Sequence, residues 1–272
     1  MTKKIVITSG KGGVGKTTVT ANLGMALAKS GYRVCLIDLD FGLNNLDVTL
    51  GLENKITYDI LDVAENRCRA KQALIQDQNV KNLYVLPSGA YKNGNSLSGQ
   101  QIKLIIENLS PLFDYCLIDC PAGIDIGFHR AVACADQAIV VVTPTLTSLR
   151  DADKVIQVLK SYKLDNVGIV INRTRGDLII SQKILSPYQI ESLLKTSLIG
   201  VLPEEDAVFL FGITPKSTDS FKAYKILAKN VEKGSKKIFD TTSKYCGFLG
   251  SIRRGLKKSI WKRIIKLVEP KV

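Results

Sequence analysis

The sequence lacks any long apolar run. The longest uninterrupted stretch lies around Ala138–Val142, far short of the roughly 20 residues that a membrane-spanning helix needs. The amino terminus carries Lys3 and Lys4, but the apolar run behind them covers only three residues before a polar Thr-Ser-Gly stretch. This start has no secretory h-region. We therefore expect no spanning helix, no secretory leader, and a protein that stays on the side of the membrane where it is made.

Closely spaced cysteine pairs are also missing. The six cysteines stand at positions 35, 68, 116, 120, 134 and 246, and no two of them form a C-x-x-C pair. Three lie inside or beside apolar runs, where thiols behave as small buried hydrophobic groups. This pattern favours structural thiols in a reducing compartment. No internal repeat is present.

Positive charge is unevenly distributed. The formal net charge is +13, and residues 246–272 hold eight Lys or Arg against Glu269 alone, a net +7 in that segment. Charge concentrated at one end indicates an interaction tail on a mildly basic body. Anionic lipid and a nucleic-acid phosphate backbone are both possible targets of such a tail.

Short runs rich in β-branched residues recur along the chain, and each is apolar throughout rather than alternating. Buried parallel strands have this character. The runs are Ile5–Thr8, Val34–Ile37, Leu83–Leu86, Cys116–Ile118, Ile139–Thr143, Val167–Ile171 and Ile199–Leu202.

Helical patterns separate these runs, among them Thr17–Ser30, Gly99–Leu109 and Leu149–Tyr162. Alternation of strand and helix predicts an α/β fold with a doubly wound, mostly parallel sheet flanked by helices. We expect an ATPase domain over residues 1–232, a polar linker over 233–250 and a C-terminal amphipathic helix over 251–269.

A phosphate-binding loop follows the first predicted strand. The run Gly10-Lys11-Gly12-Gly13-Val14-Gly15-Lys16-Thr17 matches G-x-x-x-x-G-K-[ST] between a strand and a helix, the context that the motif requires. Its glycines let backbone N–H groups surround the β-phosphate, and the helix N-terminus adds partial positive charge. Lys16 is expected to reach the β- and γ-phosphates and Thr17 to bind Mg²⁺, with Thr18 completing the predicted MgATP site.

Carboxylates end two further predicted strands. Asp119 closes the run Tyr115–Ile118, and it is the expected magnesium carboxylate. Asp38 and Asp40 end the second strand, where they could bind the metal's ligand shell or orient the attacking water. Capping or solvating the following loop is the simpler alternative for these two acids.

Lys11 makes the resemblance to a family specific. A second lysine inside the loop gives the K-G-G-x-G-K-[ST] form, which resembles the deviant Walker A ATPases of the MinD/ParA family. In that family the matching lysine reaches the phosphates bound by a second subunit, so ATP bridges a homodimer. The resemblance therefore implies a catalytic role in trans for Lys11, beside Lys16, Asp38 and Asp40.

Within this family the chain looks like MinD over nearly its whole length. The segments that carry the likeness are Val6–Thr18, Ile37–Asp47, Asn82–Pro87, Asp119–Ile124 and Ser148–Asp153. The resemblance implies that Asn45 lies near the dimer seam. It also implies that Asn172 reads adenine, with Pro203, Glu204 and Glu205 beside the base. The segment Phe209–Lys216 departs from the family pattern, which puts its loop contacts in doubt.

The same likeness implies a function and partners. It suggests an ATP hydrolase, slow without an activator, that dimerises on MgATP, binds membranes reversibly and helps to place the division septum. It implies a MinC-like inhibitor and a MinE-like activator at the helix near Ser148–Asp153, although helix capping by Asp151 and Asp153 explains that stretch equally well. The expected location is the cytoplasmic face of the inner membrane, or the stroma and inner envelope of a plastid.

The basic tail has the pattern of a membrane anchor. At 100° per residue, apolar side chains occupy about half the wheel and Lys258, Lys262, Arg263 and Lys266 the other half. An amphipathic, basic, Trp-containing helix suits an anionic interface. A last helix packed on the body is the alternative. The expected membrane-contacting residues are Leu256, Ile260, Trp261, Ile264, Ile265 and Leu267.

Two other functions fit parts of the sequence. A ParA-type DNA-partition ATPase would use the basic residues on DNA phosphates, but phosphate binding does not need an amphipathic helix, so we expect no nucleic acid. An iron–sulfur carrier would need cysteines across a dimer. Cys120 follows Asp119 directly, and no second suitably placed cysteine is evident.

Overall fold

The computed structural model describes residues 1–41, 45–89 and 97–255. All six predicted membrane-contacting residues, from Leu256 to Leu267, therefore lie outside the described residues. Within the described part of the chain, no helix combines the length and hydrophobicity needed to cross a bilayer.

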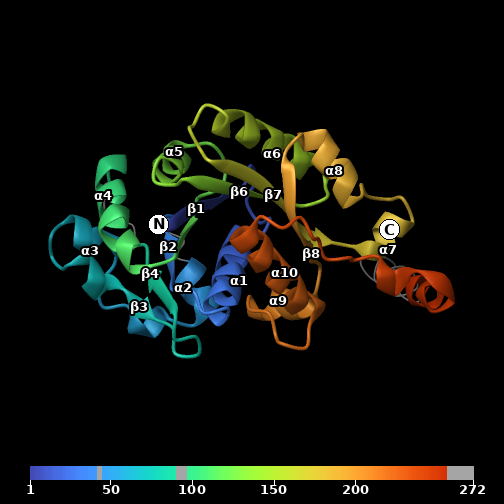
Figure 1. The fold of residues 1–272 in the computed structure, drawn as a ribbon, viewed down its shortest axis with the longest axis horizontal. Helices are drawn as coiled ribbons and strands as arrows, with labels where there is room; N and C mark the ends of the chain where they lie inside the picture. Colours follow the sequence, from blue (N-terminus) through green and yellow to red (C-terminus); the bar gives the residue numbers. More distant parts are fainter. Residues whose placement is uncertain (42–44, 90–96, 256–272) are drawn as a thin grey trace, which may run out of the picture.

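Eight strands form one sheet in the order β3-β4-β2-β5-β1-β6-β7-β8 (Figure 1). Every neighbouring pair is parallel except β3 and β4. The seven predicted strands and their mostly parallel, doubly wound arrangement are confirmed. The two-residue edge strand β3 was not predicted. The strands are β1 Lys3–Thr8, β2 Val34–Asp38, β3 Ile75–Gln76, β4 Leu83–Leu86, β5 Tyr115–Asp119, β6 Gln137–Val142, β7 Asn166–Thr174 and β8 Ser197–Pro203.

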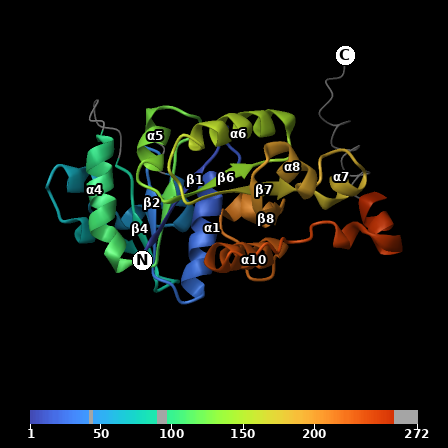
Figure 2. The same cartoon turned by 45° about the horizontal axis from the view of Figure 1, so that its top comes forward.

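Helices cover both faces of the sheet (Figure 2). One core lies between the sheet and α4, α5, α6 and α8, and the other between the sheet and α1, α2 and α10. The helices are α1 Lys16–Lys29, α2 Asn45–Leu50, α3 Ile60–Ala64, α4 Gly99–Leu109, α5 Ile126–Val132, α6 Leu146–Leu159, α7 Gly176–Ile180, α8 Pro187–Leu194, α9 Asp206–Phe211 and α10 Asp219–Lys233. Short 3₁₀ turns cover Glu53–Lys55, Ala70–Ala73, Ser110–Leu112 and Ser243–Tyr245.

The two cores explain why the strands are apolar throughout. In β2, Cys35 and Ile37 enter one core, whereas Val34 and Leu36 enter the other. Successive side chains of a strand point to opposite faces, so a sheet covered on both faces needs apolar residues at every position. Cys116 is buried on the neighbouring strand β5, and it is a free thiol as expected.

Helix α6 begins earlier than predicted. It starts at Leu146 instead of Leu149, with Thr145 at the N-cap position. Asp151 and Asp153 consequently lie beyond the first turn, which holds no acidic residue. The interpretation of these two residues as N-terminal caps is wrong, because a capping side chain must sit at the helix start.

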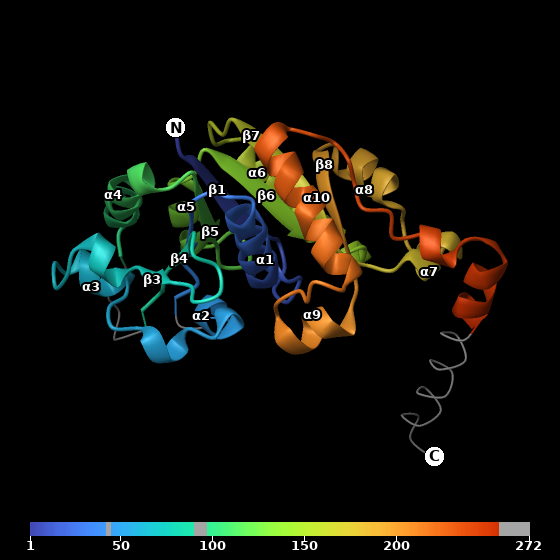
Figure 3. The same ribbon diagram turned by 60° about the horizontal axis from the view of Figure 1, so that its bottom comes forward.

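The segment after α10 lies against the body. Thr241 and Tyr245 are buried, and Lys244 forms an ion pair of 3.0 Å with Asp219 at the start of α10. A helix then begins at residue 247, rather than at the predicted 251, and is described as far as residue 255. Figure 3 shows this helix beyond α7, at the far end of the molecule from α3. Polar composition predicted a linker over 233–250, but it could not reveal these packed contacts.

Gly176 offers a test of how tightly this segment is fixed. A Cβ at this position would overlap the backbone carbonyl of Thr241 and lie 3.0 Å from the Tyr245 ring. We expect Gly176→Ala to lower the free energy of unfolding by roughly 1–3 kcal/mol, because a backbone carbonyl cannot rotate away as a side chain can. Limited proteolysis should also cut residues 234–246 faster.

Gly99→Ala is the matched control, because its added Cβ would have nothing closer than Arg130 Cγ at 3.6 Å. Denaturant unfolding and proteolysis measure both variants. Equal stability of the two would show that the segment does not pack as described.

Candidate functional site

The phosphate-binding loop joins β1 to α1 and depends on its glycines. Gly13 and Gly15 have φ values of 75° and 96°, a region that side chains with a Cβ rarely adopt. A Cβ on Gly15 would also lie 2.5 Å from Asn172 Nδ2. Lys16 begins α1 and is buried, with 7% of its surface exposed. The loop thus places a nearly buried ammonium at the N-terminus of a helix, which suits an anionic ligand.

Two buried carboxylates meet beside this loop. Asp38 and Asp119 end β2 and β5 in matching register, and they are 2% and 1% exposed. Thr17 Oγ1 donates to Asp119 Oδ2 at 2.7 Å, and Thr20 Oγ1 donates to Asp119 Oδ1 at 3.1 Å. The backbone N–H of Asp40 donates to Asp38 Oδ1 at 2.9 Å. The parallel sheet therefore brings together acids that lie far apart in the sequence.

Burial sets the acidity of this group. Burial, with added repulsion from Asp119, raises the pKa of Asp38 from 3.8 to about 7. Burial also raises the pKa of Asp119 to about 6, although the Thr17 hydrogen bond and the Lys16 charge act against it. The pKa of Asp40 is raised overall, because the effect of burial exceeds the opposing effect of the Lys16 charge. Two carboxylates that are costly to ionise together favour a cation between them.

The donor set fits Mg²⁺. The Thr17 hydroxyl and the Asp38 and Asp119 carboxylates supply hard oxygen ligands, and Mg²⁺ is usually held by one or two carboxylates plus substrate phosphates. Among the described residues, no group of three or more acidic, His or Cys side chains could hold a metal alone.

Thr20 was missed by the sequence analysis. It lies three residues after Thr17, so both hydroxyls share one face of α1 and both reach Asp119. That spacing could have identified it.

Lys11 lies apart from Lys16. It is exposed, and its Nζ contacts Thr147 Oγ1 of α6 at 3.3 Å. Gly10 beside it packs so closely on the backbone of Asp151 that a Cβ would overlap that residue. The loop therefore holds one lysine in its interior and presents the other at its rim.

The predicted base-side residues lie at the ends of β7 and β8. Asn172 is 8% exposed, and its Nδ2 donates to the carbonyl of Val14 at 2.8 Å, so it contacts the backbone of the phosphate-binding loop. Pro203 pairs with Thr174 across the two strand ends. Glu204 lies 3.7 Å from Arg175. The sheet thus brings Asn172 into contact with the loop and places Pro203 and Glu204 beside Thr174 and Arg175 at the end of β7.

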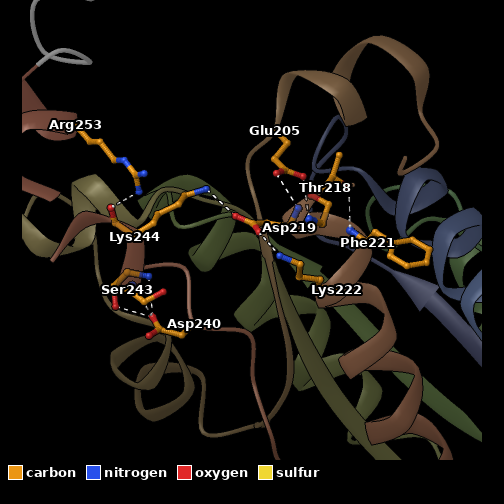
Figure 4. A network of polar contacts seen from close by, with 11 residues as sticks. Glu205, Thr218, Asp219, Phe221, Lys222, Asp240, Ser243, Lys244 and Arg253 are labelled. Carbon is orange, nitrogen blue, oxygen red and sulfur yellow. Dashed lines mark hydrogen bonds and ion pairs between the residues drawn. The ribbon is translucent and has the colours of Figure 1, made fainter. Parts of the chain in front are cut away.

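Glu205 has a structural task that the sequence did not reveal. Its carboxylate accepts hydrogen bonds from the backbone N–H groups of Asp219 and Ser220, at 3.1 and 2.9 Å, at the start of α10 (Figure 4). Asp219 in turn holds Lys244 (Figure 4). This network joins the end of β8 to the C-terminal segment.

The segment Phe209–Lys216, which departs from the family pattern, covers the end of α9 and the turn after it. Asn22 of α1 fixes it through a bond from Nδ2 to the Gly212 carbonyl at 2.7 Å and a bond from the Thr214 N–H to Oδ1 at 2.8 Å. Phe209, Phe211 and the leucine between them are exposed.

The acid pair predicts a pH-dependent stability in protein free of nucleotide and magnesium. Because the folded-state pKa of Asp38, about 7, exceeds the ordinary 3.8, the folded state binds more protons between these pH values. The free energy of unfolding should therefore fall as the pH rises from about 4 to about 7. Asp38→Asn should remove much of this slope and stabilise the protein by roughly 2–4 kcal/mol at pH 7.5.

Urea unfolding at several pH values measures the effect, and Asp165→Asn, which removes an exposed carboxylate, is the control. A slope that Asp38→Asn leaves unchanged would contradict the assignment.

Comparison with known proteins identifies the family. A family model described as an AAA domain matches residues 2–171. The septum site-determining protein MinD of Synechocystis sp. is 44% identical over 210 residues, covering 77% of this chain and 79% of that protein.

Solved structures show the same fold. The MinD of an Aquifex aeolicus MinC:MinD cell division protein complex matches with a TM-score of 0.80 and 41% identity, over 86% of this chain and 96% of that chain. The Pyrococcus horikoshii MinD complexed with Mg-ADP matches with a TM-score of 0.77 and 31% identity, over 86% and 97%. By sequence and by fold, the chain therefore belongs to the MinD family of septum site-determining P-loop ATPases.

Proposed function

We propose that this chain binds MgATP, dimerises around it, hydrolyses it slowly, and attaches to an anionic membrane surface in the dimeric state to help place the division septum. The observation that carries the proposal is the separation of two lysines within one loop, with Lys16 7% exposed inside it and Lys11 exposed at its rim. A phosphate ligand needs only the inner lysine. The outer lysine is free to serve a nucleotide held by a second copy.

Each polar group then has a task. Lys16 binds the β- and γ-phosphates, and Thr17, Asp38 and Asp119 hold Mg²⁺, which supplies charge neutralisation for phosphoryl transfer. Asp40, with Asp38, orients the attacking water. Asn172, Pro203 and Glu204 flank the base. Lys11 of each copy stabilises charge that develops on the nucleotide of the other copy.

The described start of the C-terminal helix supports membrane attachment. Phe248, Leu249 and Ile252 are 82%, 70% and 47% exposed and lie on one side of the helix. The predicted anchor residues from Leu256 onward would add to the apolar surface of the tail. Two such helices on one dimer bind far more tightly than one, because the second engages at high local concentration. The expected location is the cytoplasmic face of the inner membrane, or the stromal side of a plastid envelope.

The partner surface is proposed on α6. The Aquifex aeolicus relative is in a complex with MinC. In this chain Ser148 and Leu149 are buried, whereas Leu146, Arg150 and Asp153 are exposed. We assign these three to contacts with a MinC-like inhibitor and a MinE-like activator.

Replacement of Lys11 tests dimerisation. Wild-type protein should be dimeric with ATP and monomeric with ADP, and Lys11→Ala should weaken the ATP dimer by roughly 10²–10³-fold, the usual cost of losing one such charge. Sedimentation velocity measures the dimer. Nucleotide binding should persist, because Lys16 remains.

Lys163→Ala, another exposed lysine, is the control and should dimerise normally. If the Lys11 variant still paired only in the presence of ATP, the role in trans would be wrong.

Vesicles test membrane attachment. The intact chain should co-sediment with phosphatidylglycerol vesicles in ATP but not in ADP, and anionic vesicles should raise its ATPase turnover. A chain ending at Tyr245 should lose both effects. Phe248→Ser with Leu249→Ser should lower binding by roughly 10-fold or more, because two exposed apolar side chains are removed from the interface.

Duplex DNA is the competing ligand. Tight, steeply salt-dependent DNA binding with no effect of vesicles would favour a ParA-type partition ATPase instead.

A further inference from the structure

A cavity of about 880 Å³ lies beneath the C-terminal helix. Its walls come from the turn after β6, the end of β7, α7, and residues Ser251, Arg254 and Gly255 of that helix. The nucleotide-binding residues Lys16, Thr17 and Asp119 do not line it. The cavity is therefore distinct from the phosphate-binding loop, although Glu204 borders it.

The charges of this cavity are unbalanced. Arg173, Arg175, Lys183 and Arg254 line it, against Asp177 and Glu204. Both carboxylates interact with Arg175. This residue donates two hydrogen bonds to Asp177, of 3.0 and 2.7 Å, and lies 3.7 Å from Glu204.

None of the other three cations forms an ion pair within the part of the chain that the structure describes. Arg254 donates to the carbonyl of Tyr245. Three cations around one cavity repel each other, and an anion between them would relieve that repulsion.

Part of the cavity wall is apolar. Pro144, Leu178 and Ile184 contribute side chains without charge. A site with cations on one side and apolar groups on another suits an amphiphile better than a free inorganic ion.

The backbone is irregular at Arg173. The register between β7 and β8 shifts between Ile171 and Thr174, and Arg173 has a φ of 53°. Successive side chains of a strand point to opposite faces. Asn172 accordingly contacts the phosphate-binding loop, whereas Arg173 lines the cavity.

The helix above the cavity has two different sides. At about 100° per residue, Phe248, Leu249 and Ile252 share one arc, and Arg254 lies on the opposite side of the helix. The three apolar residues are exposed, whereas Arg254 is half-buried and lines the cavity. A helix lying in a membrane interface through its apolar side would therefore hold the cationic cavity at headgroup depth.

We propose that this cavity binds the phosphodiester headgroup of an anionic phospholipid, with Arg173, Lys183 and Arg254 around the phosphate. This rests on the proposed membrane attachment and adds a lipid-selective site to it. The helix then supplies general affinity for the interface, while the cavity selects the lipid.

Soluble short-chain lipids test the site in the full-length chain. Dihexanoyl phosphatidylglycerol, below its micelle concentration, should bind by calorimetry, and dihexanoyl phosphatidylcholine and inorganic phosphate should bind at least about 10-fold more weakly. Arg173→Gln with Lys183→Gln should weaken phosphatidylglycerol binding by roughly 10–100-fold, because two charge-assisted contacts are lost.

Lys160→Gln with Lys163→Gln removes the same charge from exposed positions at the other end of α6 and should have no effect. Equal loss in both double variants would overturn the site, because only net charge would then matter. Inorganic phosphate binding as tightly as the lipid would overturn the lipid assignment.

Vesicle sedimentation keeps this inference separate from the proposed function. Wild-type sedimentation that depends on ATP, combined with unchanged lipid binding in the Arg173/Lys183 variant, would refute the cavity alone. Absence of that sedimentation in the wild type would refute the membrane switch, whatever the short-chain lipids do.

Discussion

The burial of the neighbouring Asp38 and Asp119 carboxylates is the constraint around which the nucleotide site is arranged. Both groups end neighbouring parallel strands, and both are nearly excluded from water. Burial raises the pKa of both carboxyls, and the Asp119 charge raises that of Asp38 further. Such a pair destabilises the empty protein and favours a bound cation. The Thr17 and Thr20 hydroxyls and the Lys16 charge offset part of this cost, so the site can fold before any ligand arrives.

Close backbone packing keeps this site in place. Gly10 lies against the backbone of Asp151 in α6, and Gly15 lies against Asn172 of β7. These contacts couple the phosphate-binding loop to the helix that carries the proposed partner surface and to the strand end that carries the proposed base contacts. A ligand that shifts the loop must therefore shift at least one of them, because packed backbone leaves little free volume.

A second chain of contacts leads from the end of β8 to the C-terminus. Glu205 holds the start of α10, Asp219 at that start holds Lys244, and the Lys244 carbonyl accepts from Arg253 at 3.2 Å. These contacts connect the end of the described chain to the carboxyl end of β8. The nucleotide site also lies at the carboxyl ends of strands, those of β2 and β5. The proposed lipid site and the proposed base contacts share Glu204.

The sequence by itself determined the strands, the phosphate-binding loop and its two lysines. The reason is that these features are local: a run of apolar residues, a spacing of glycines and a lysine at a fixed position each act through neighbours in the chain. The tertiary structure alone decided which residues meet across long separations. It paired Asp38 with Asp119, placed Thr20 on the same carboxylate, and turned Asn172 toward Val14. It also packed Thr241 and Tyr245 onto the body and gathered Arg173, Lys183 and Arg254 around one cavity. Such contacts depend on strand order and helix placement, which no local pattern encodes.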